Sequence, residues 1–193
     1  MTKKKYVIGI DEVGRGPLAG PVLVAAVAVP VGLRPRCGKF PLRDSKRLSA
    51  IQRGHWFEFI KNHPKIDFAV ARLQPRSVDR LNIAKAANRA ATRALKRLNK
   101  AGAPVYLDGG LFLEKLPAVK AKTVVRGDGK INAVKLASIV AKVTRDKYMV
   151  KLHKKLPEYG FDEHKGYGTK KHKRAIGRHG LSDFHRKSFC KFV

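Results

Sequence analysis

The chain of 193 residues is 44% hydrophobic, so it is long enough to fold as one domain around a buried core. No uncharged apolar run approaches the roughly 20 residues that a membrane-spanning helix needs, and the N-terminal residues lack the pattern of a signal peptide. Cys37 and Cys190 lack the paired spacing of a zinc motif or a disulfide framework. These features exclude a membrane protein and a disulfide-rich secreted protein, and we expect a single cytoplasmic domain over residues 1–193.

The charge of the chain is strongly unbalanced. It carries 43 Lys and Arg residues against 14 Asp and Glu, which gives a formal net charge of +29. Solubility alone asks for a net charge of about 2 to 8 on a small domain. Because lysine and arginine gain affinity by releasing counterions from phosphates, the composition predicts nucleic acid as the natural partner.

Apolar runs and turn signals predict strands and helices along the whole chain. Strands rich in Val and Ile come first, and the helix that follows begins with a capping box formed by Ser49 and Gln52. In chain order the expected elements are strands at 4–10 and 22–29, a helix at 50–62, a strand at 66–73, a helix from 77 or 79 to 99, strands at 105–107 and 122–125, and helices at 132–156 and 170–178. Strands that come first and then alternate with helices predict an α/β fold with a mixed sheet.

Acidic residues stand where three of these strands end. They are the pair Asp11 and Glu12, then Asp108, then Asp128. Strand ends at one edge of an open α/β sheet are where ligand sites form, so we expect these side chains to converge. Neighbouring side chains on a regular strand point to opposite faces, so Asp11 and Glu12 can share a site only if the strand ends between them. The glycines at positions 14 and 16 favour such an end.

Four carboxylates held close together repel one another unless a divalent cation neutralises them. Mg²⁺ and Mn²⁺ accept oxygen ligands and bind phosphate oxygens, and two such ions about 3.5 to 4 Å apart can activate a water for an in-line displacement. The expected reaction is therefore phosphodiester hydrolysis, with these four acids as the catalytic and metal-binding set. Asp146 is left out of the set, because Lys142 lies four residues before it on the same expected helix and an ion pair accounts for it.

A competing motif covers part of the same segment. Residues 14–19 fit the G-x-G-x-x-A form of a dinucleotide-binding fingerprint. That fingerprint needs a helix that opens at the glycines, whereas Pro17 and the apolar run from Val22 predict a strand. The acidic pair would also repel a pyrophosphate. We therefore do not expect a dinucleotide site.

Seven stretches give the chain a specific resemblance to a known family. In order along the chain they are residues 9–22 (GIDEVGRGPLAGPV), 44–49 (DSKRLS), 107–109 (LDG), 127–128 (GD), 137–146 (ASIVAKVTRD), 166–169 (GYGT) with His172, and 185–189 (HRKSF). Together they resemble type 2 ribonuclease H, the bacterial ribonuclease HII family. The resemblance implies a ribonuclease H-like fold, a five-stranded mixed sheet flanked by helices. It also implies a helical C-terminal segment at about 160–193 that contributes to substrate binding.

The resemblance implies roles for individual residues as well. The four acids correspond to the metal-binding catalytic carboxylates of the family, the same set that the strand ends indicate. The turn formed by Gly14, Arg15 and Gly16 corresponds to the one that reads the 2′-hydroxyl of a ribonucleotide, largely through backbone groups. Tyr167 corresponds to the aromatic residue that packs on the neighbouring sugar and admits a DNA residue after the RNA one. Lys46 is implied to contact a phosphate.

Other positions keep two interpretations each. His172 and the pair His185-Arg186 fit either substrate contact or packing of the C-terminal segment. Lys135 stands where the family has a small-residue run, so it faces either solvent or substrate. The Gly-Arg-Gly turn, and a chain without an N-terminal extension, favour type 2 over the sister type 3 enzymes.

The expected protein is a monomeric endonuclease that needs Mn²⁺ or Mg²⁺. It would cut the RNA strand of RNA–DNA hybrids, and duplex DNA on the 5′ side of an embedded ribonucleotide, leaving 3′-hydroxyl and 5′-phosphate ends. One alternative is a non-enzymatic basic nucleic-acid-binding protein, for which the charge alone would suffice but which leaves the strand-end acids unexplained. A second alternative is a related metal-dependent nuclease that acts on damaged DNA.

Overall fold

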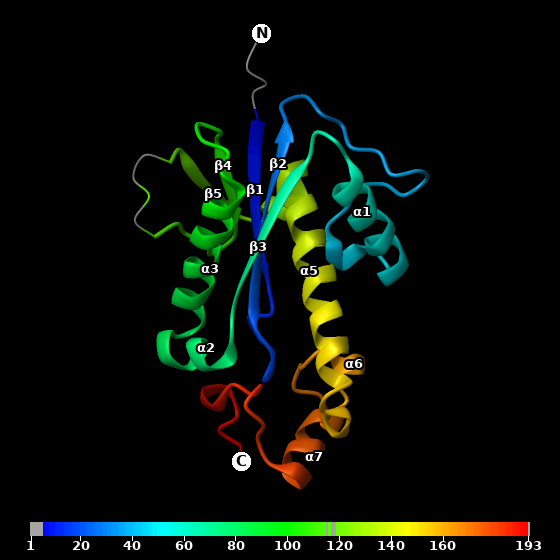
Figure 1. The fold of residues 1–193 in the computed structure, drawn as a ribbon, viewed down its shortest axis with the longest axis vertical. Coiled ribbons are helices and arrows are strands. Elements are labelled where there is room, and N and C mark those ends of the chain that lie inside the picture. The colour runs from blue at the N-terminus through cyan, green and yellow to red at the C-terminus, as the bar shows by residue number, and fades with distance from the viewer. Residues whose placement is uncertain (1–5, 115, 117–118, 193) are drawn as a thin grey trace.

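The computed structural model describes residues 6–114, 116 and 119–192, which fold around one five-stranded sheet (Figure 1). The strands are β1 (Tyr6–Val13), β2 (Val22–Pro30), β3 (Asp67–Leu73), β4 (Val105–Asp108) and β5 (Ala121–Val124), in the spatial order β3-β2-β1-β4-β5. The pairs β1-β2 and β2-β3 are antiparallel, whereas β1-β4 and β4-β5 are parallel. The expected mixed sheet is confirmed. Residues 4 and 5 of the first expected strand lie outside the described residues.

Helices cover both faces of the sheet (Figure 1). The helices are α1 (Ala50–Asn62), α2 (Pro75–Leu81), α3 (Ile83–Leu98), α4 (Gly127–Lys130), α5 (Asn132–His153), α6 (Phe161–His164) and α7 (Lys170–His179), with 3₁₀ turns at Ser45–Arg47, Pro157–Tyr159 and Lys187–Phe189. α2 and α3 lie on one face, and α1 and α5 lie on the other. Within the described ranges, no helix combines the length and the apolarity needed to cross a membrane.

The central strands are buried on both sides, which is why β1 and β2 read as nearly continuous apolar runs. On one face Ile8 and Ile10 pack against a stripe of alanines on α3. On the other face Val27 packs in a cluster with Trp56 of α1 and Leu136 of α5. Small side chains on α3 let that helix lie close to the sheet and keep the interior densely packed.

The C-terminal segment forms a third packed unit at the end of α5, at the bottom of Figure 1. Phe161 of α6 and Ile176 of α7 are buried there with Met149 of α5 and Leu18 of the loop between β1 and β2. α7 begins after Thr169, whose side chain accepts a hydrogen bond from the first turn of the helix. The helix expected at 170–178 is therefore present, and its unit contacts the loop that follows β1.

Two element boundaries differ from expectation for local reasons. The single helix expected up to residue 99 is two helices, because Asn82 adopts φ 66° and ψ 164° and accepts a hydrogen bond from Lys85 N at 3.0 Å. Its side chain thus caps α3 while its backbone breaks the helix. Pro75 starts α2 earlier than expected, at a first-turn position where proline's missing N–H has no intrahelical partner to lose.

Three further differences concern β1, α5 and the segment around Asp128. β1 does not end at Ile10 but continues to Val13, because residues 11–13 keep their antiparallel pairing with β2. α5 ends at His153 rather than at residue 156. The short helix α4 replaces what the sequence indicated only as a turn around Asp128.

Gly9 sets how closely α5 packs on β1. A Cβ at this position would lie 2.1 Å from the Ala133 carbonyl carbon and 2.2 Å from Val134 N, both backbone atoms at the start of α5. The helix therefore touches the strand through bare backbone, which brings the first turns of α5 against the end of β1 that carries Asp11.

Replacing Gly9 with alanine should destabilise the fold, because overlap with a helix backbone cannot be relieved by a change of rotamer. Overpacked cores lose roughly 1–3 kcal/mol, so we expect the melting temperature in a thermal denaturation followed by circular dichroism to fall by roughly 5 °C. Gly54 of α1 provides the control: a Cβ there meets nothing within 4 Å, and alanine is the better helix former, so Gly54→Ala should keep or raise the melting temperature. A Gly9→Ala protein as stable as its parent would contradict the close packing of α5 on β1.

Candidate active site

Three carboxylates from separate elements meet at one edge of the sheet. Asp11 lies on β1, Asp108 is the last residue of β4, and Asp128 lies on α4. One carboxylate oxygen from each lies within 4.8 Å of the other two. The structure therefore brings together three of the four acids that the sequence singled out.

Sheet topology and backbone hydrogen bonds hold this arrangement. β1 and β4 are parallel neighbours, so Asp11 and Asp108 arrive at the same edge. Asp108 Oδ1 accepts hydrogen bonds from Gly127 N at 2.6 Å and from Asp128 N at 3.4 Å. One carboxylate thus lies at the N-terminus of α4, where it satisfies otherwise unpaired N–H groups and fixes Asp128 beside itself.

Burial and mutual repulsion make negative charge on this cluster costly. Burial raises the pKa of Asp11 well above its ordinary value, and the charges of Glu12 and Asp108 raise it further, while a hydrogen bond with Ser138 acts in the opposite direction. Burial also raises the pKa of Asp128, and Asp108 adds to that effect. A nearby cation would reverse both shifts, because opposite charge favours the ionised form.

Glu12 lies beside this trio rather than within it. The expectation that the strand ends between Asp11 and Glu12 is wrong, because β1 stays paired past both, and their side chains leave opposite faces of the strand. Glu12 Oε1 accepts a hydrogen bond from Arg15 Nη1 at 3.3 Å, and Oε2 is buried with no hydrogen-bond partner among the described residues. Burial raises the pKa of Glu12, Arg15 lowers it and Asp108 raises it, so Glu12 is close enough to Asp108 to interact with its charge.

The donor set fits a hard divalent cation. All the converging ligand atoms are carboxylate oxygens, which Mg²⁺ and Mn²⁺ prefer. The unpartnered oxygen of Glu12, and the raised pKa values of Asp11 and Asp128, indicate that Arg15 and Lys46 offset the negative charge of the site only in part. Asp11, Asp108 and Asp128 could hold an ion directly, with Glu12 at the border of the site.

An open cleft of about 1040 Å³ lies against Asp108 and Asp128. Its walls come from the segment before α1 and from the segment that joins β5 to α5. Basic side chains make up much of its lining: Arg43, Lys46, Arg47, Arg126, Lys130 and Lys135. Lys135, whose direction the sequence left open, therefore lies on the cleft. Cations that border a group of carboxylates suit a phosphate backbone that passes over the acids.

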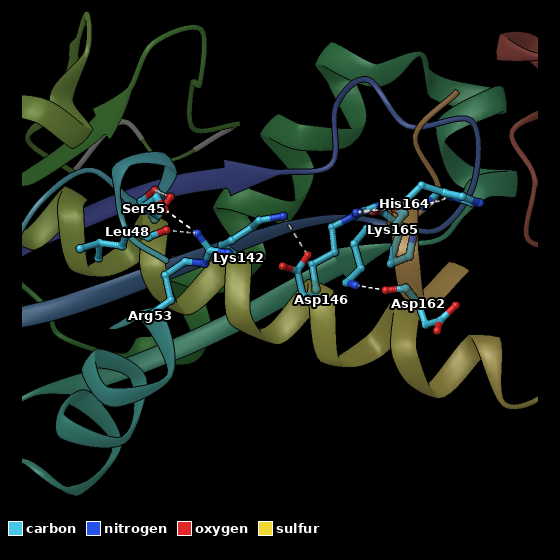
Figure 2. Close-up of polar contacts among 12 residues, drawn as sticks. Ser45, Leu48, Arg53, Lys142, Asp146, Asp162, His164 and Lys165 are labelled. Carbon is cyan, nitrogen blue, oxygen red and sulfur yellow. Dashed lines mark hydrogen bonds and ion pairs between the residues drawn. The ribbon is translucent and has the colours of Figure 1, made fainter. Parts of the chain in front are cut away.

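Lys46 lies beside the acids, on a short segment whose backbone is held by Arg53. Its Nζ lies 3.9 Å from Asp128 Oδ2, and its side chain is 83% exposed. Partial burial lowers the pKa of Lys46, but the neighbouring carboxylates, Asp128 first, outweigh that effect and raise the pKa above its ordinary value. Figure 2 shows Arg53 of α1 donating to the carbonyls of Ser45 and Leu48, on either side of Lys46. Lys46 is thus a cation within reach of a phosphate beside Asp128.

Asp146, which the sequence analysis left out of the metal set, has the partner predicted for it. Lys142 Nζ lies 2.9 Å from Asp146 Oδ1, one turn along α5 (Figure 2). Because this carboxylate already has a cationic partner on its own helix, Asp146 serves as a control for the three site acids.

Two buried arginines hold the loop between β1 and β2 (residues 14–21). Arg145 of α5 donates to the carbonyls of residues 19 and 21 at 3.1 and 3.0 Å, and Arg186 donates to those of residues 14, 15 and 20 at 2.6 to 3.1 Å. Both side chains are fully buried. Burial lowers the pKa of both arginines, that of Arg186 to about 9, which still leaves each charged at neutral pH.

The sequence analysis missed the role of Arg145, although a signal was present. Arg145 lies four residues after Ala141 and four before Met149, both buried, so it falls on the apolar stripe of α5. A charged residue on such a stripe needs a polar partner, and the carbonyls of the loop 14–21 provide it. Arg186, which the sequence left open between two roles, packs inside the protein.

Gly14 and Gly16 differ in what requires them. Gly14 has φ +86°, and a Cβ there would lie 2.3 Å from Arg145 Nε, so the fold itself requires glycine at this position. Gly16 has no such constraint, because its φ lies outside the left-handed region and a Cβ would meet nothing within 4 Å. A glycine that the fold does not require leaves the backbone open to the close approach of a ligand.

Tyr167 is attached to the same loop from the C-terminal side. The carbonyl of Gly166 accepts hydrogen bonds from Leu18 N at 2.8 Å and Ala19 N at 3.3 Å, and a Cβ on Gly166 would lie 2.5 Å from the Ala19 oxygen. Tyr167 is 43% exposed, and the Arg145 guanidinium lies 6.0 Å from its ring centroid. An exposed aromatic ring therefore lies beside the loop 14–21, although the two are far apart in sequence.

Comparison of the sequence with known protein families identifies the family of this chain. A sequence model of the family described as Ribonuclease HII matches residues 8–192. The chain belongs to the ribonuclease HII family. A relative from Coxiella burnetii named Ribonuclease HII is 45% identical over 183 residues, which cover 95% of this chain and 87% of that protein.

Solved structures share the fold of this ribonuclease HII family member. The crystal structure of ribonuclease H2 from Pyrococcus horikoshii OT3 matches with a TM-score of 0.77 at 25% identity, over 95% of this chain and 93% of that one. Bst-RNase HIII, solved in complex with Mn²⁺, matches with a TM-score of 0.68 at 19% identity, over 97% of this chain and 68% of that one. The expected ribonuclease H-like fold is confirmed.

Membership in the ribonuclease HII family makes the chain a ribonuclease H, an enzyme that acts on nucleic acid. The non-enzymatic basic binding protein is therefore not favoured. The dinucleotide fingerprint also lacks its structural context, because residues 14–21 form a loop that leads into β2 instead of opening a helix.

Replacing Asp11 with asparagine should raise the thermal stability of the metal-free protein at pH 8. The pKa of Asp11 is raised in the folded state, so its charged form costs stability that grows as the pH rises from its unfolded pKa of about 3.9 through the folded value. We expect the melting temperature in EDTA to exceed that of the parent at pH 8, and the difference to shrink as the pH falls toward 4.

Adding Mn²⁺ or Mg²⁺ should raise the melting temperature of the parent protein more than that of Asp11→Asn, because the variant lacks one of the carboxylates that would bind the ion. Asp146→Asn is the control, because that carboxylate pairs with Lys142 and not with the site acids. A metal-induced shift of equal size in Asp11→Asn and the parent would contradict a metal site at these residues.

Proposed function

We propose that the chain is a metal-dependent endonuclease with two related substrates. It cuts the RNA strand of RNA–DNA hybrids, and it cuts duplex DNA on the 5′ side of an embedded ribonucleotide, leaving 3′-hydroxyl and 5′-phosphate ends. The observation that carries this proposal is the continuity of Asp11 on β1 with the Gly14-Arg15-Gly16 turn that directly follows the strand. A ribose bound at the turn would have its phosphate next to the carboxylates.

The proposed metal ligands are Asp11, Asp108, Asp128 and Glu12, which serve Mn²⁺ or Mg²⁺. The oxygen-only donor set supports these metals, and so does the Mn²⁺ complex of Bst-RNase HIII, a protein of the same fold. We propose two ions when substrate is bound, which Asp11, Asp108 and Asp128 would hold with the help of Glu12. When bound, such ions lower the pKa of the attacking water and offset the charge of the leaving oxygen.

In this proposal the backbone N–H groups of the turn bind the sugar. The carbonyls of Gly14 and Arg15 are already occupied, because they accept hydrogen bonds from the Arg186 guanidinium. In a trans peptide the C=O and the following N–H point in opposite directions, so the N–H groups of Arg15 and Gly16 point away from Arg186. Donors directed outward from a glycine turn suit the 2′-hydroxyl, the group that distinguishes RNA from DNA.

The remaining contacts belong to the strand that is cut. The basic residues of the cleft, Lys46 first, bind its phosphates, and the exposed ring of Tyr167 packs on the sugar after the ribonucleotide. The segment 160–193 contributes to this surface by holding Tyr167. We propose a monomer as the active unit, because the acids, the turn and the tyrosine all come from one chain.

The proposal is tested with matched duplexes that carry none, one or several ribonucleotides, each with Mg²⁺ or Mn²⁺, and with the cut sites and end groups mapped on sequencing gels. We expect no cutting without a ribonucleotide and a cut on the 5′ side of a single one. Cutting of a ribonucleotide-free duplex at a damaged base would favour the nuclease for damaged DNA instead.

Asp108→Asn should reduce kcat/KM on both substrates by at least about 100-fold, because loss of one metal ligand removes several kcal/mol of charge stabilisation from the transition state. Duplex affinity, measured by fluorescence anisotropy, should hold or increase, since the change removes a negative charge from a surface that binds phosphate. Asp146→Asn should retain full activity. Full cutting by Asp108→Asn would rule out the proposed carboxylate site.

Gly16→Ala should fold as stably as the parent but lose at least about tenfold in kcat/KM at a single ribonucleotide, because its Cβ would occupy the space that the ribose approaches. Gly14→Ala should instead lower the melting temperature, since its Cβ would overlap Arg145. The two variants are compared by thermal denaturation and by cleavage assays. A Gly16→Ala enzyme with normal activity would show that substrate does not approach this backbone.

A further inference from the structure

A chain of hydrogen bonds runs through two buried histidines to the backbone of Tyr167. His172 on α7 is 0% exposed and His185 is 2% exposed, and their Nε2 atoms lie 3.0 Å apart. At one end of the chain, His172 Nδ1 lies 2.9 Å from the Tyr167 carbonyl oxygen. At the other end, Ser182 N donates to His185 Nδ1 at 3.0 Å. Neither histidine has a role in the chemistry proposed above.

These partners fix the position of the proton on each ring. His185 Nδ1 accepts from the Ser182 backbone N–H, and the Ser182 hydroxyl, 2.9 Å from the same nitrogen, can donate to it as well. The proton of a neutral His185 therefore lies on Nε2, which donates to His172 Nε2. The proton of His172 then lies on Nδ1, which donates to the Tyr167 carbonyl. A second proton on His172 would lie on Nε2 and face the His185 N–H, so the chain holds only while both rings are neutral. Burial lowers the pKa of each histidine to about 4, in agreement with this assignment.

The same C-terminal stretch holds the loop 14–21. His185 forms an antiparallel bridge with Ala19. The next residue, Arg186, donates its backbone N–H to the Leu18 carbonyl at 2.7 Å and its guanidinium to the carbonyl of Gly14. The Tyr167 backbone and the sugar-reading loop are thus tied to one short segment, residues 182–186.

A third histidine fixes the backbone just before Tyr167. His164 stacks on His172 with ring centroids 4.4 Å apart, and its Nδ1 accepts a hydrogen bond from Gly166 N at 3.2 Å. Its Nε2 lies 2.8 Å from the Tyr159 carbonyl oxygen; His164 is labelled in Figure 2. The ring of Tyr167 projects from a backbone that is held on both sides, so the protein controls this residue through its main chain.

We propose that His172, with its tautomer set by His185, is a positioning residue for Tyr167 and sets the preference of the enzyme for a single ribonucleotide in DNA over a long RNA–DNA hybrid. This inference rests on the proposed function, in which Tyr167 packs on the sugar after the ribonucleotide. A single ribonucleotide can be bound for cutting in only one register, so its cleavage depends on a correctly placed Tyr167 ring. A long hybrid can be bound in many registers, so its cleavage depends less on that ring.

The test compares two substitutions at one site. His172→Phe keeps a flat ring but cannot donate to the Tyr167 carbonyl, whereas His172→Asn can place an N–H where Nδ1 lies but fills the core less well. The readout is the ratio of kcat/KM on a single-ribonucleotide duplex to kcat/KM on a hybrid. We expect His172→Phe to lower the ratio about tenfold, the size of one lost hydrogen bond, and His172→Asn to stay within about threefold of the parent. His179→Phe, at an exposed position of the same helix, should leave the ratio unchanged.

A packing role makes the opposite prediction, because the smaller side chain leaves the larger cavity. A ratio lowered more by His172→Asn than by His172→Phe would therefore overturn the proposal. Combining His172→Phe with Tyr167→Ala should give the same ratio as Tyr167→Ala alone, since His172 acts through the tyrosine. A further fall in the double variant would also overturn it.

Failure of the proposed function gives a different result. If Tyr167→Ala itself leaves the ratio unchanged, Tyr167 does not sense the junction, and the role of His172 fails with it. If Tyr167→Ala lowers the ratio and His172→Phe does not, only the histidine inference fails. Side-chain ¹⁵N–¹H correlation spectra read the tautomers without any activity: a proton on His172 Nε2 at pH 7 would overturn the inference, and one on Nδ1 supports it.

Discussion

The site depends on how two buried arginines use their hydrogen bonds. Arg145 and Arg186 lie inside the protein, where an unpaired guanidinium would be costly, and their partners are backbone carbonyls of the loop 14–21. A loop without regular structure cannot satisfy its own carbonyls. The arginines therefore supply hydrogen-bond donors to the loop, and the loop carbonyls supply acceptors to the arginines. The loop is thereby fixed between α5 and the C-terminal segment. Removing either arginine would leave several buried carbonyls without partners, which costs more than the loss of one surface contact.

In the proposed function, this fixed loop couples sugar recognition to chemistry within a small region. β1 continues through Asp11 and Glu12 to Val13, so the carboxylates belong to a paired strand and the turn starts immediately after it. Sheet pairing on both sides of β1 leaves Asp11 little freedom to move relative to Asp108. Under the proposed function, preorganised carboxylates next to a rigid turn would let the binding of a ribose position the phosphate, and such orientation lowers the barrier of a reaction.

The sequence predicts the mixed sheet and the convergence of three of the four acids well, because apolar runs and strand ends are local signals. Asp108 and Asp128 follow short apolar runs, and parallel pairing brings such ends to one edge whatever the intervening chain does. The break at Asn82 was missed because the apolar stripe continues across it, although asparagine is a favoured N-cap residue and tolerates a positive φ. The relation of Glu12 to Asp11 was missed because glycines suggested an early strand end, whereas pairing with β2 keeps the strand intact. Pairs such as His172 and His185 depend on tertiary contacts and cannot be read from spacing.

In the proposed function, the positive surface and the buried carboxylates of this protein have different tasks, binding and cutting. A net charge of +29 and a basic cleft lining favour the approach of nucleic acid at long range. Close to the cleft, three clustered carboxylates repel a phosphate unless a divalent cation stands between them. In the proposed function, affinity comes mainly from the lysines and arginines, and a bound metal ion would decide whether a phosphate can approach the acids. The carboxylates need to be few and buried for this to work, because an acidic surface would cancel the attraction, and Asp11 and Asp128 are indeed almost fully enclosed.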